Sequence, residues 1–489
     1  MPLQLVTTAI DYTNGAPHIG HAYEKVLADA IKRFENMRGV NTVLLTGVDQ
    51  HGQKIERAAL AAGVAPNLYV QTYTNYFREL SDKLGIHYTE FVETTNPRHV
   101  KFVKCILTQL FEDGHIYRAK QKGWYSIREE QFLSDKDRDE HGGFNIDKWG
   151  EVEEREEENY YFKLKPHLPW LRKFLATHPR CAQPNGWQTE LMAAALTFDN
   201  DLCISRPKTR VRWGITLPFD DKYVTYVWFD ALLNYLSFQP GDVKNVIHVI
   251  GKDILAPSHG IYWLIMLHVL NTPDNEVPSF VVHGWWLTPK GDKASKSAGN
   301  SDSVLDLIDK YGVNMMRFGL FYGMTPGNDA TWDEERMIEL YNGVLVNKVG
   351  NLIHRVLSMV HKYSAGKICQ PPKWAELVKP ILRLHGKTPY TLMLDGIKMA
   401  EVINTEIEEY KPWEKAKDPA KANELSAKLY AMVQGVRMVG YCLWPVLPKL
   451  AEELAYLLNV ATLEEPLGSE VKTPVILLPR ITYESPHPQ

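Results

Sequence analysis

Cysteine is scarce in this chain, and its cysteines stand far apart from one another. The five positions include no C-x-x-C pair: Cys105, Cys181, Cys203, Cys369 and Cys442. A structural zinc site needs about four nitrogen or sulfur ligands in close array, and disulfides belong to oxidising compartments. We therefore expect no structural zinc, no other metal held by protein ligands, and a reducing compartment.

Long apolar runs and an excess of basic charge are also missing. The longest nearly apolar stretch, residues 260–270, is too short to cross a bilayer and contains His268. No basic segment followed by an apolar one precedes the strand-like residues 3–10, as a secretory signal would require. The formal net charge of −4 restricts any contact with nucleic acid to local surfaces. These absences predict a cytoplasmic protein without a membrane partner.

The first part of the chain alternates strand-like and helical stretches. Apolar runs occupy residues 4–10, 41–46 and 245–250, and helical patterns occupy residues 22–37 and 67–84. Such alternation predicts an α/β fold with a parallel sheet. In sheets of this kind, ligands bind beyond the carboxyl ends of the strands.

Residues 114–218 differ in composition from the segments on either side, because they are rich in tryptophan, tyrosine and short loops. We interpret them as an insertion between two halves of the parallel sheet. The acidic run 151–158 within this insertion is typical of a solvated face.

The last third of the chain is predicted to be a bundle of about four or five helices. Apolar residues recur there at three- and four-residue spacing, in residues 337–363, 390–409, 420–443 and 448–458. Residues 473–481 are predicted to form a strand, and residues 485–489 a loose tail.

The stretch His18-Ile19-Gly20-His21 lies between an apolar run with a Gly-Ala-Pro turn and a helical pattern. This order indicates a strand, a turn and a helix N-terminus, where free N–H groups favour an anionic phosphate ligand. Gly20 lets a ligand approach the backbone, and a histidine can donate hydrogen bonds that strengthen as negative charge develops. A motif of four residues is nevertheless a weak signal by itself.

A second motif, Lys293-Ala294-Ser295-Lys296-Ser297, lies far downstream in a stretch rich in glycine and polar residues. Its two ammonium groups and two hydroxyls are suited to hold a leaving pyrophosphate. Taken alone, such a loop is more often a solvated connector.

Together the two motifs resemble the HIGH and KMSKS signatures of the class I aminoacyl-tRNA synthetases. Further blocks are similar to methionyl-tRNA synthetases, and they follow in order over almost the whole chain: residues 9–21, 46–52, 226–231, 251–254, 347–355 and 411–413. The missing C-x-x-C pairs correspond to a short, zinc-free form of that family.

The resemblance implies a split Rossmann-like catalytic domain with an inserted connective domain and a C-terminal all-α bundle. The implied segments are residues 1–113 and 219–288 for the two catalytic halves, 114–218 for the connective domain, 289–336 for the KMSKS-loop and stem-contact region, and 337–489 for the helical anticodon-binding domain with its tail.

The resemblance also implies a role for each matched residue. The methionine pocket would consist of Ile10, Tyr12, Asp49, Trp228, Ala231, Tyr235, Ile254, His259 and Trp263. ATP would meet His18, Gly20, His21, Gly251, Asp253, Lys293, Ser295 and Lys296, of which His18, His21, Lys293 and Lys296 would be catalytic. The anticodon would be read by Asn351, Arg355 and Trp413.

Within these sets, the Ile10 carbonyl and Asp49 would hold the substrate ammonium. An aromatic pocket suits a polarizable thioether, and stacking suits the bases of a single-stranded loop. The implied activity is ATP-dependent activation of L-methionine and its transfer to tRNA(Met) by a monomeric enzyme that uses ATP with Mg2+.

Simpler interpretations exist for single residues of these sets. Trp228 and Trp263 alone could be core aromatics, and Asp49 could be a helix cap. Asn351 and Arg355 could be an intrahelical pair, since they lie one turn apart.

The sequence departs from the family pattern at several points. Ala294 replaces a methionine of the KMSKS loop, and Asp11 is unusual beside the pocket. One additional residue stands between Asp253 and His259, which loosens the assignments of His259 and Trp263. The alternatives are therefore a weakly catalytic paralogue that binds RNA, and another class I synthetase. The short insertion leaves little room for the editing domain that leucine, isoleucine and valine enzymes carry.

Overall fold

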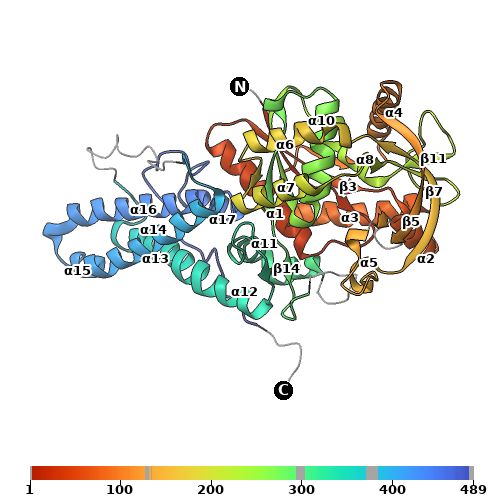
Figure 1. Cartoon of the computed structure of the whole chain (residues 1–489). Coiled ribbons are helices and arrows are strands. Elements are labelled where there is room, and N and C mark those ends of the chain that lie inside the picture. The colour runs from red at the N-terminus through yellow and green to blue at the C-terminus, as the bar shows by residue number, and fades with distance from the viewer. Residues whose placement is uncertain (1–2, 127–130, 134, 293–302, 370–383, 484–489) are drawn as a thin grey trace, which may run out of the picture.

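The structure is a computed structural model that describes residues 3–126, 131–133, 135–292, 303–369 and 384–483 (Figure 1). The parallel sheet predicted from the alternating pattern is present. Its strands run in the order β2-β3-β1-β12-β13-β8, with β4 paired to β3, and each pairing is parallel. The strands are β1 (Leu3–Thr8), β2 (Asp11–Tyr12), β3 (Thr42–Asp49), β4 (Glu90–Glu93), β8 (Ala182–Gln183), β12 (Val243–Gly251) and β13 (Ser279–His283).

Helices cover the sheet, as crossover connections between parallel strands require. They include α1 (Ile19–Met37), α2 (Gln53–Ala61), α3 (Pro66–Leu84), α4 (Pro97–Glu112), α7 (Asn185–Thr197), α8 (Val227–Leu232) and α10 (Leu264–Val269). Helix α1 buries most of its length, because small and aliphatic residues face both the sheet and α11 (Val304–Tyr322). Its N-terminus follows the loop after β2, which places the first motif beyond the carboxyl ends of the strands.

The predicted insertion contains an antiparallel sheet of its own, with the order β6-β5-β7-β9. Its strands are β5 (Ile116–Ser126), β6 (Gln131–Leu133), β7 (Val152–Phe162) and β9 (Leu202–Cys203), and the short pair β10 (Ser205–Pro207) and β11 (Tyr223–Thr225) follows. The acidic run lies on β7, where Glu154 and Glu156 are exposed. These two residues form part of the expected solvated face. Glu157 on the same strand is instead largely buried against Arg210.

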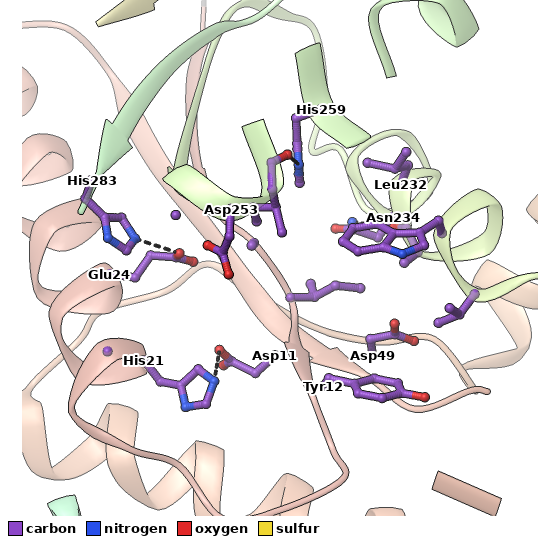
Figure 2. A pocket seen from close by; sticks show the side chains of 18 of the residues that line it. Asp11, Tyr12, His21, Glu24, Asp49, Leu232, Asn234, Asp253, His259 and His283 are labelled. Carbon is purple, nitrogen blue, oxygen red and sulfur yellow. Dashed lines mark hydrogen bonds and ion pairs between the residues drawn. The ribbon is translucent and has the colours of Figure 1, made fainter. Parts of the chain in front are cut away.

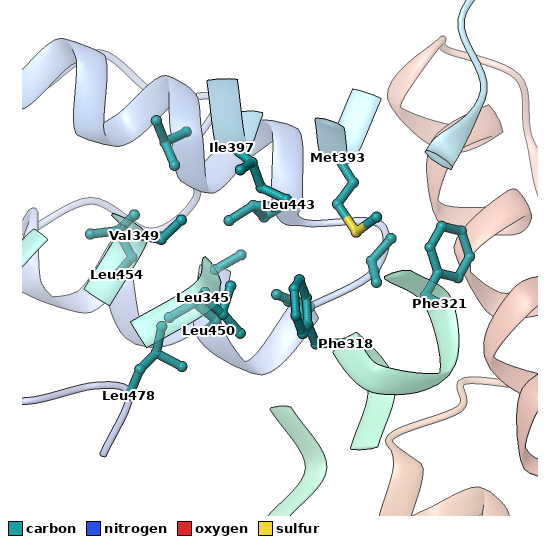
Figure 3. Close-up of a cluster of buried hydrophobic side chains, with 14 of the residues drawn as sticks. Phe318, Phe321, Leu345, Val349, Met393, Ile397, Leu443, Leu450, Leu454 and Leu478 are labelled. Carbon is teal, nitrogen blue, oxygen red and sulfur yellow. The ribbon is translucent and has the colours of Figure 1, made fainter. Parts of the chain in front are cut away.

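The helical region begins with α12 (Glu334–Leu340) and continues through a π-helix, η7 (Tyr341–Gly350), into α13 (Asn351–Ser364). It is completed by α14 (Pro389–Tyr410), α15 (Pro412–Lys415), α16 (Ala422–Leu443) and α17 (Pro448–Leu457). Leu345, Val349, Ile397 and Leu443 meet in its core (Figure 3). The four predicted helical stretches are therefore confirmed, although the π-helix interrupts the first.

The strand predicted at residues 473–481 is wrong. This segment has no strand partner and runs as an extended chain along the helices. The Tyr341 hydroxyl donates to the carbonyl of Pro479 at 3.2 Å, and the Asn342 amide donates to that of Ile481 at 2.7 Å. Leu478 is buried against Gly350, so side chains and not a ladder hold the segment.

The division into five segments stays a prediction, although the antiparallel sheet falls within residues 114–218. Within the described ranges, no helix combines the length and apolar character needed to cross a membrane.

Candidate functional site

A cavity of about 340 Å³ opens beyond the carboxyl ends of β1, β3, β12 and β13, beside the N-terminus of α1 (Figure 2). All of the predicted ATP and methionine contacts that fall in the described ranges line this cavity, with the exception of Trp263. The predicted Lys293, Ser295 and Lys296, with Ala294 between them, lie outside the described residues. The cavity thus gathers residues that the sequence spreads over more than 250 positions.

His18 and His21 form a reciprocal cap on helix α1. The His18 ring accepts a hydrogen bond from the backbone of Gly20 through Nδ1, and the His21 ring accepts one from the backbone of His18 through Nδ1, both at 3.1 Å. The two rings stack with centroids 3.7 Å apart. Because Nδ1 is an acceptor in both rings, each neutral imidazole carries its proton on Nε2. Both rings therefore have an N–H suited to a phosphate ligand.

A buried ion pair that the sequence did not assign lies beside this cap. Lys25 Nζ is 2.5 Å from Asp11 Oδ2 and donates to Thr46 Oγ1 at 3.1 Å. Burial raises the pKa of Asp11, while Lys25 opposes that shift. The other oxygen of Asp11 is 3.8 Å from His21 Nε2. The departure of Asp11 from the family pattern was the signal for this pair, since a carboxylate in an apolar wall needs a buried cation.

Glu24 and His283 form a second unassigned pair in the cavity wall. His283 Nε2 lies 3.0 Å from Glu24 Oε2, so α1 is tied to the end of β13. Burial raises the pKa of Glu24. Nearby, the Trp285 indole donates to Asp253 Oδ1 at 3.2 Å. Glu24 could not be recognised from the sequence, because its spacing on α1 is that of any helical residue.

The predicted methionine half of the cavity has a neutral floor. His259 Nδ1 is 2.9 Å from the carbonyl of Ile254, so Nδ1 carries the ring proton and Nε2 accepts from the Tyr235 hydroxyl, also at 2.9 Å. Burial lowers the pKa of His259 to about 4. The ring is therefore uncharged near neutral pH, and it offers no cation to compete for a carboxylate.

Trp263 lies behind this floor and not in it. Its indole donates to His248 Nε2 at 3.0 Å, and His248 Nδ1 is 2.7 Å from Thr7 Oγ1. Its ring is 5.5 Å from that of Tyr235. Trp263 thus supports the lining from the core, whereas Trp228 lines the cavity directly.

The additional residue before His259 lies in a π-helix, η4 (Leu255–Trp263). A kink at Ala256, where φ is −129° and ψ is 133°, interrupts the segment before His259, and His259 still lines the cavity. Gly260 allows the segment to approach α7, because a Cβ there would lie 2.2 Å from Leu191.

Asp49 ends β3 and does not cap a helix. The N-cap of α2 is Gly52, which has no side chain to make a cap hydrogen bond. The Asp49 carboxylate instead receives the backbone N–H of His51 at 3.4 Å and the Thr94 hydroxyl at 3.5 Å. These contacts fix its direction at the edge of the cavity.

Asp230 joins the segment after Asp49 to helix α8. It is fully buried, and its two oxygens are 2.7 Å from His51 Nδ1 and 2.7 Å from His99 Nε2. The two histidines offset the effect of burial and lower the pKa of Asp230 to about 2. Helix α8 carries Trp228 and Ala231, so the network fixes one wall of the cavity relative to the other.

The three predicted anticodon residues lie at the helical region, away from the cavity. Arg355 of α13 stacks over Trp413 of α15, with its guanidinium carbon 5.5 Å from the ring centroid. It also pairs with Glu408 of α14 at 2.7 Å. Asn351 is exposed one turn earlier on α13. The structure brings Arg355 and Trp413 together, with an ion pair between helices.

Metal ligands do not gather in the part of the chain that the structure describes. No group of three or more histidine, cysteine, aspartate or glutamate side chains there is arranged to hold a metal ion.

Comparisons with known proteins identify the family of the chain. The profile of the family "tRNA synthetases class I (M)" matches residues 4–140 and 147–357. The methionine–tRNA ligase of Deinococcus radiodurans is 36% identical, over 97% of this chain and 74% of that protein. The methionine–tRNA ligase of Rickettsia conorii is 33% identical, over 97% and 98%. The structure of the Mycobacterium tuberculosis methionyl-tRNA synthetase in complex with methionyl-adenylate matches with a TM-score of 0.87 and 29% identity, over 98% and 100%.

Proposed function

The chain belongs to the methionyl-tRNA synthetases of class I, and from this premise we propose which residues of its cavity bind methionine and which bind ATP. The protein is a methionine–tRNA ligase that activates L-methionine with ATP and charges tRNA. The observation that carries the proposal is the convergence of the predicted ATP and methionine residues on one cavity.

The first step is a displacement at phosphorus. An oxygen of the methionine carboxylate forms a bond to the α-phosphorus of ATP, and the bond from that phosphorus to the bridging oxygen of the β-phosphate breaks. Pyrophosphate leaves and methionyl-adenylate remains. In the second step a terminal ribose hydroxyl of the tRNA attacks the methionyl carbonyl, and AMP leaves. Both steps depend on positioning and on stabilisation of developing negative charge.

Methionine occupies the half of the cavity formed by aromatic and neutral side chains. Tyr12, Trp228 and Ala231 surround the thioether, and Tyr235 with His259 forms the floor. These groups suit a polarizable sulfur that has no strong hydrogen-bond donor. Asp49 and the Ile10 carbonyl accept hydrogen bonds from the ammonium group, while Ile254 closes the pocket and Trp263 supports it from behind.

ATP occupies the half beside helix α1. His18 and His21 direct their Nε2 protons to the phosphates, and Gly20 leaves room for them at the helix N-terminus. Gly251 and Asp253, at the end of β12, hold the ribose. Lys293, Ser295 and Lys296 bind the pyrophosphate. ATP enters as its Mg2+ complex.

The helical region binds the anticodon loop of tRNA(Met). Trp413 and Arg355 offer a stacking surface with a cation, and Asn351 offers an amide to a base edge. The enzyme acts in the cytoplasm as a monomer, and the measured mass in solution tests the second statement.

Methionine-dependent exchange of pyrophosphate into ATP tests the assignment. Trp228→Ala should raise the methionine KM about tenfold with little change in the ATP KM, because the lost aromatic contact with the thioether contributes about 1.4 kcal/mol, the equivalent of a factor of ten. Equal effects on the two KM values would contradict the division of the cavity.

A lack of exchange in the unaltered protein at saturating methionine would favour the alternative of a weakly catalytic, RNA-binding paralogue. Exchange driven by a different amino acid would favour another class I synthetase.

A further inference from the structure

The segment between β10 and β11 reaches from the inserted sheet to residues 50–53, which we name the 50–53 loop. Three hydrogen bonds join them. The Trp213 indole donates to the carbonyl of Gln50 at 2.5 Å, the Gly52 N–H donates to the carbonyl of Trp213 at 3.1 Å, and Arg210 Nη2 donates to Gln53 Oε1 at 3.1 Å. The 50–53 loop therefore has a second set of contacts besides the parallel sheet that it leaves.

The opposite side of the 50–53 loop contacts the proposed methionine pocket. Gly52 has a φ of +116°, and a Cβ there would lie 2.5 Å from the Tyr12 hydroxyl. His51 is bound to Asp230 of α8, the helix that carries Trp228. Asp49 directly precedes the loop. A shift of the 50–53 loop would therefore move residues on three sides of the pocket.

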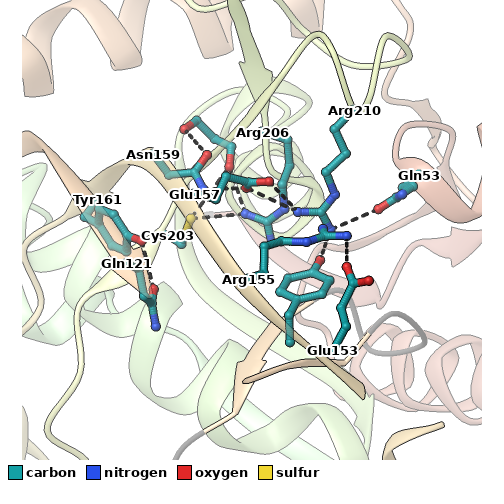
Figure 4. Close-up of polar contacts among 12 residues, drawn as sticks. Gln53, Gln121, Glu153, Arg155, Glu157, Asn159, Tyr161, Cys203, Arg206 and Arg210 are labelled. Carbon is teal, nitrogen blue, oxygen red and sulfur yellow. Dashed lines mark hydrogen bonds and ion pairs between the residues drawn. The ribbon is translucent and has the colours of Figure 1, made fainter. Parts of the chain in front are cut away.

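Arg210 is anchored at its other end in the inserted sheet (Figure 4). Its Nη1 donates to both carboxylate oxygens of Glu157, at 2.9 Å and 3.2 Å, and its Nη2 contacts the hydroxyl of Tyr125. The guanidinium also lies over the Tyr125 ring, 4.2 Å from its centroid. The Arg210 and Glu157 side chains are each only 11% exposed. We name the four residues Arg210, Glu157, Tyr125 and Gln53 the Arg210 clamp.

Partial burial makes the clamp stiff and its parts interdependent. A charge-assisted hydrogen bond away from water is stronger than an exposed one. Removal of one partner leaves the other charge with poor solvation, so it must turn toward water. Loss of Glu157 would thus release Arg210 from the sheet and, with it, the hold of Arg210 on Gln53. None of the three polar partners Glu157, Tyr125 and Gln53 lines the cavity.

We propose that the Arg210 clamp positions the 50–53 loop for methionine binding, so that the inserted sheet sets the affinity of the enzyme for its amino acid. This inference rests on the proposed assignment of the methionine half of the cavity. Glu157 and Arg210 are positioning residues, because they act through the loop and touch no substrate. ATP binding, on the opposite side of the cavity, is independent of the clamp.

The test compares Glu157→Gln with Glu158→Gln in the exchange assay. Adjacent residues of a strand face opposite sides of the sheet, and Glu158 pairs with Arg118 at 2.6 Å on an exposed surface. We expect Glu157→Gln to raise the methionine KM about tenfold, the loss of one charge-assisted contact, with the ATP KM unchanged. Glu158→Gln should leave both unchanged, and Glu157→Asp, which keeps the charge, should recover part of the affinity.

A second variant tests the same clamp from the other end. Gln53→Met removes the acceptor of Arg210 on the loop and leaves no unpaired charge, so it keeps the test available if Glu157→Gln folds poorly. It should also raise the methionine KM alone. KM values do not depend on the fraction of enzyme that is folded, so a loss of stability would not by itself raise the methionine KM.

Trp228→Ala in the same assay separates the two levels of the inference. If it raises the methionine KM while Glu157→Gln and Gln53→Met behave like Glu158→Gln, the clamp has no positioning role and the proposal is overturned. If none of these variants changes the methionine KM, the assignment of the pocket itself is wrong. Equal increases in the methionine and ATP KM values would assign the clamp a general structural role and overturn the proposal.

Discussion

At the scale of single residues, Asp11 shows how a carboxylate is accommodated in a cavity that must accept a triphosphate. An unpaired carboxylate there would repel the phosphates. Lys25, only 1% exposed, lies against it and makes the pair neutral. The Asp11 carboxylate also lies 3.8 Å from His21 Nε2, so the pair borders the predicted phosphate site.

Removal of Lys25 alone should weaken ATP binding. In Lys25→Met the ATP KM should rise about tenfold or more, because a buried partner is lost. Without Lys25 the pKa of Asp11 rises further, so the carboxyl is neutral at low pH and charged at high pH. The increase in ATP KM should therefore grow as the pH rises.

The double variant Asp11→Asn/Lys25→Met is the control for this pair. It removes both charges and should restore the ATP KM to within about threefold of the unaltered enzyme, since nothing then repels the phosphates. A double variant as impaired as Lys25→Met would assign the defect to packing.

His259 should make stability depend on pH in a defined direction. Its pKa is lowered from 6.5 to about 4 by burial, so between these values the unfolded chain binds a proton that the folded chain does not. Stability is therefore complete above about pH 6.5 and falls as the pH decreases toward 4.

His259→Asn should remove this contribution. Between about pH 7 and about pH 5 the unaltered protein should lose on the order of 2 kcal/mol more than the variant in urea unfolding. Neighbouring His248, whose pKa is lowered by burial and also by His259, is present in both proteins, so the part of its contribution that comes from burial cancels in the comparison. Equal losses in the two proteins would contradict the lowered pKa.

At the scale of elements, the approach of β4 to β3 depends on the absence of a side chain at Gly47. A Cβ at this position would lie 2.3 Å from the carbonyl oxygen of Val92 and 2.5 Å from its backbone nitrogen. Gly47→Ala should lower the free energy of unfolding by about 1–3 kcal/mol, the usual cost of overpacking. Gly186→Ala, on helix α7 with no atom within 4 Å of the added carbon, is the matched control and should be neutral or slightly stabilising.

Elements in which apolar residues recur at a regular spacing could be predicted from the sequence. Elements that depend on contacts between residues distant in the chain could not. The runs at residues 4–10 and 420–443 became β1 and α16 because their apolar residues are buried: Val6 packs in the same cluster as α16, and Leu5 packs in a second cluster. The π-helix η4 left only an indirect signal, one residue too many before His259. The apolar run 473–481 has the residue pattern of a strand. Its carbonyls, however, accept hydrogen bonds from the side chains of Tyr341 and Asn342 and not from a neighbouring strand.

The same distinction holds within the candidate site. Residues in contiguous motifs, such as His18–His21, were predicted, because chemistry and spacing are visible together. Glu24, Lys25 and His283 were missed, since each acquires its role from a partner distant in the chain or hidden by helical spacing. Trp263 was assigned to the pocket lining, although burial places it one layer behind.

At the scale of the whole molecule, Arg317 of α11 joins the parallel sheet domain to the helical region. It is fully buried and pairs with Asp29 of α1 at 2.7 Å. It donates to the carbonyl of Leu84, at the end of α3, at 2.9 Å, and to that of Val446, between α16 and α17, at 2.6 Å. Phe318 and Phe321 of the same helix belong to the buried cluster that Figure 3 shows, in which Phe318 lies among the side chains of the helical region.

Arg317→Met should therefore destabilise the whole molecule and not one part of it. Three elements lose a shared donor, and Asp29 keeps only Arg33 as a charged partner, so the free energy of unfolding in urea should fall by about 3–5 kcal/mol. Arg33→Met is the matched control. It removes the other cation of Asp29, at 2.8 Å, and none of the contacts to Val446, so its effect should be clearly smaller. Equal losses would show that the ion pair with Asp29, and not the junction of the three elements, accounts for the stability that Arg317 provides.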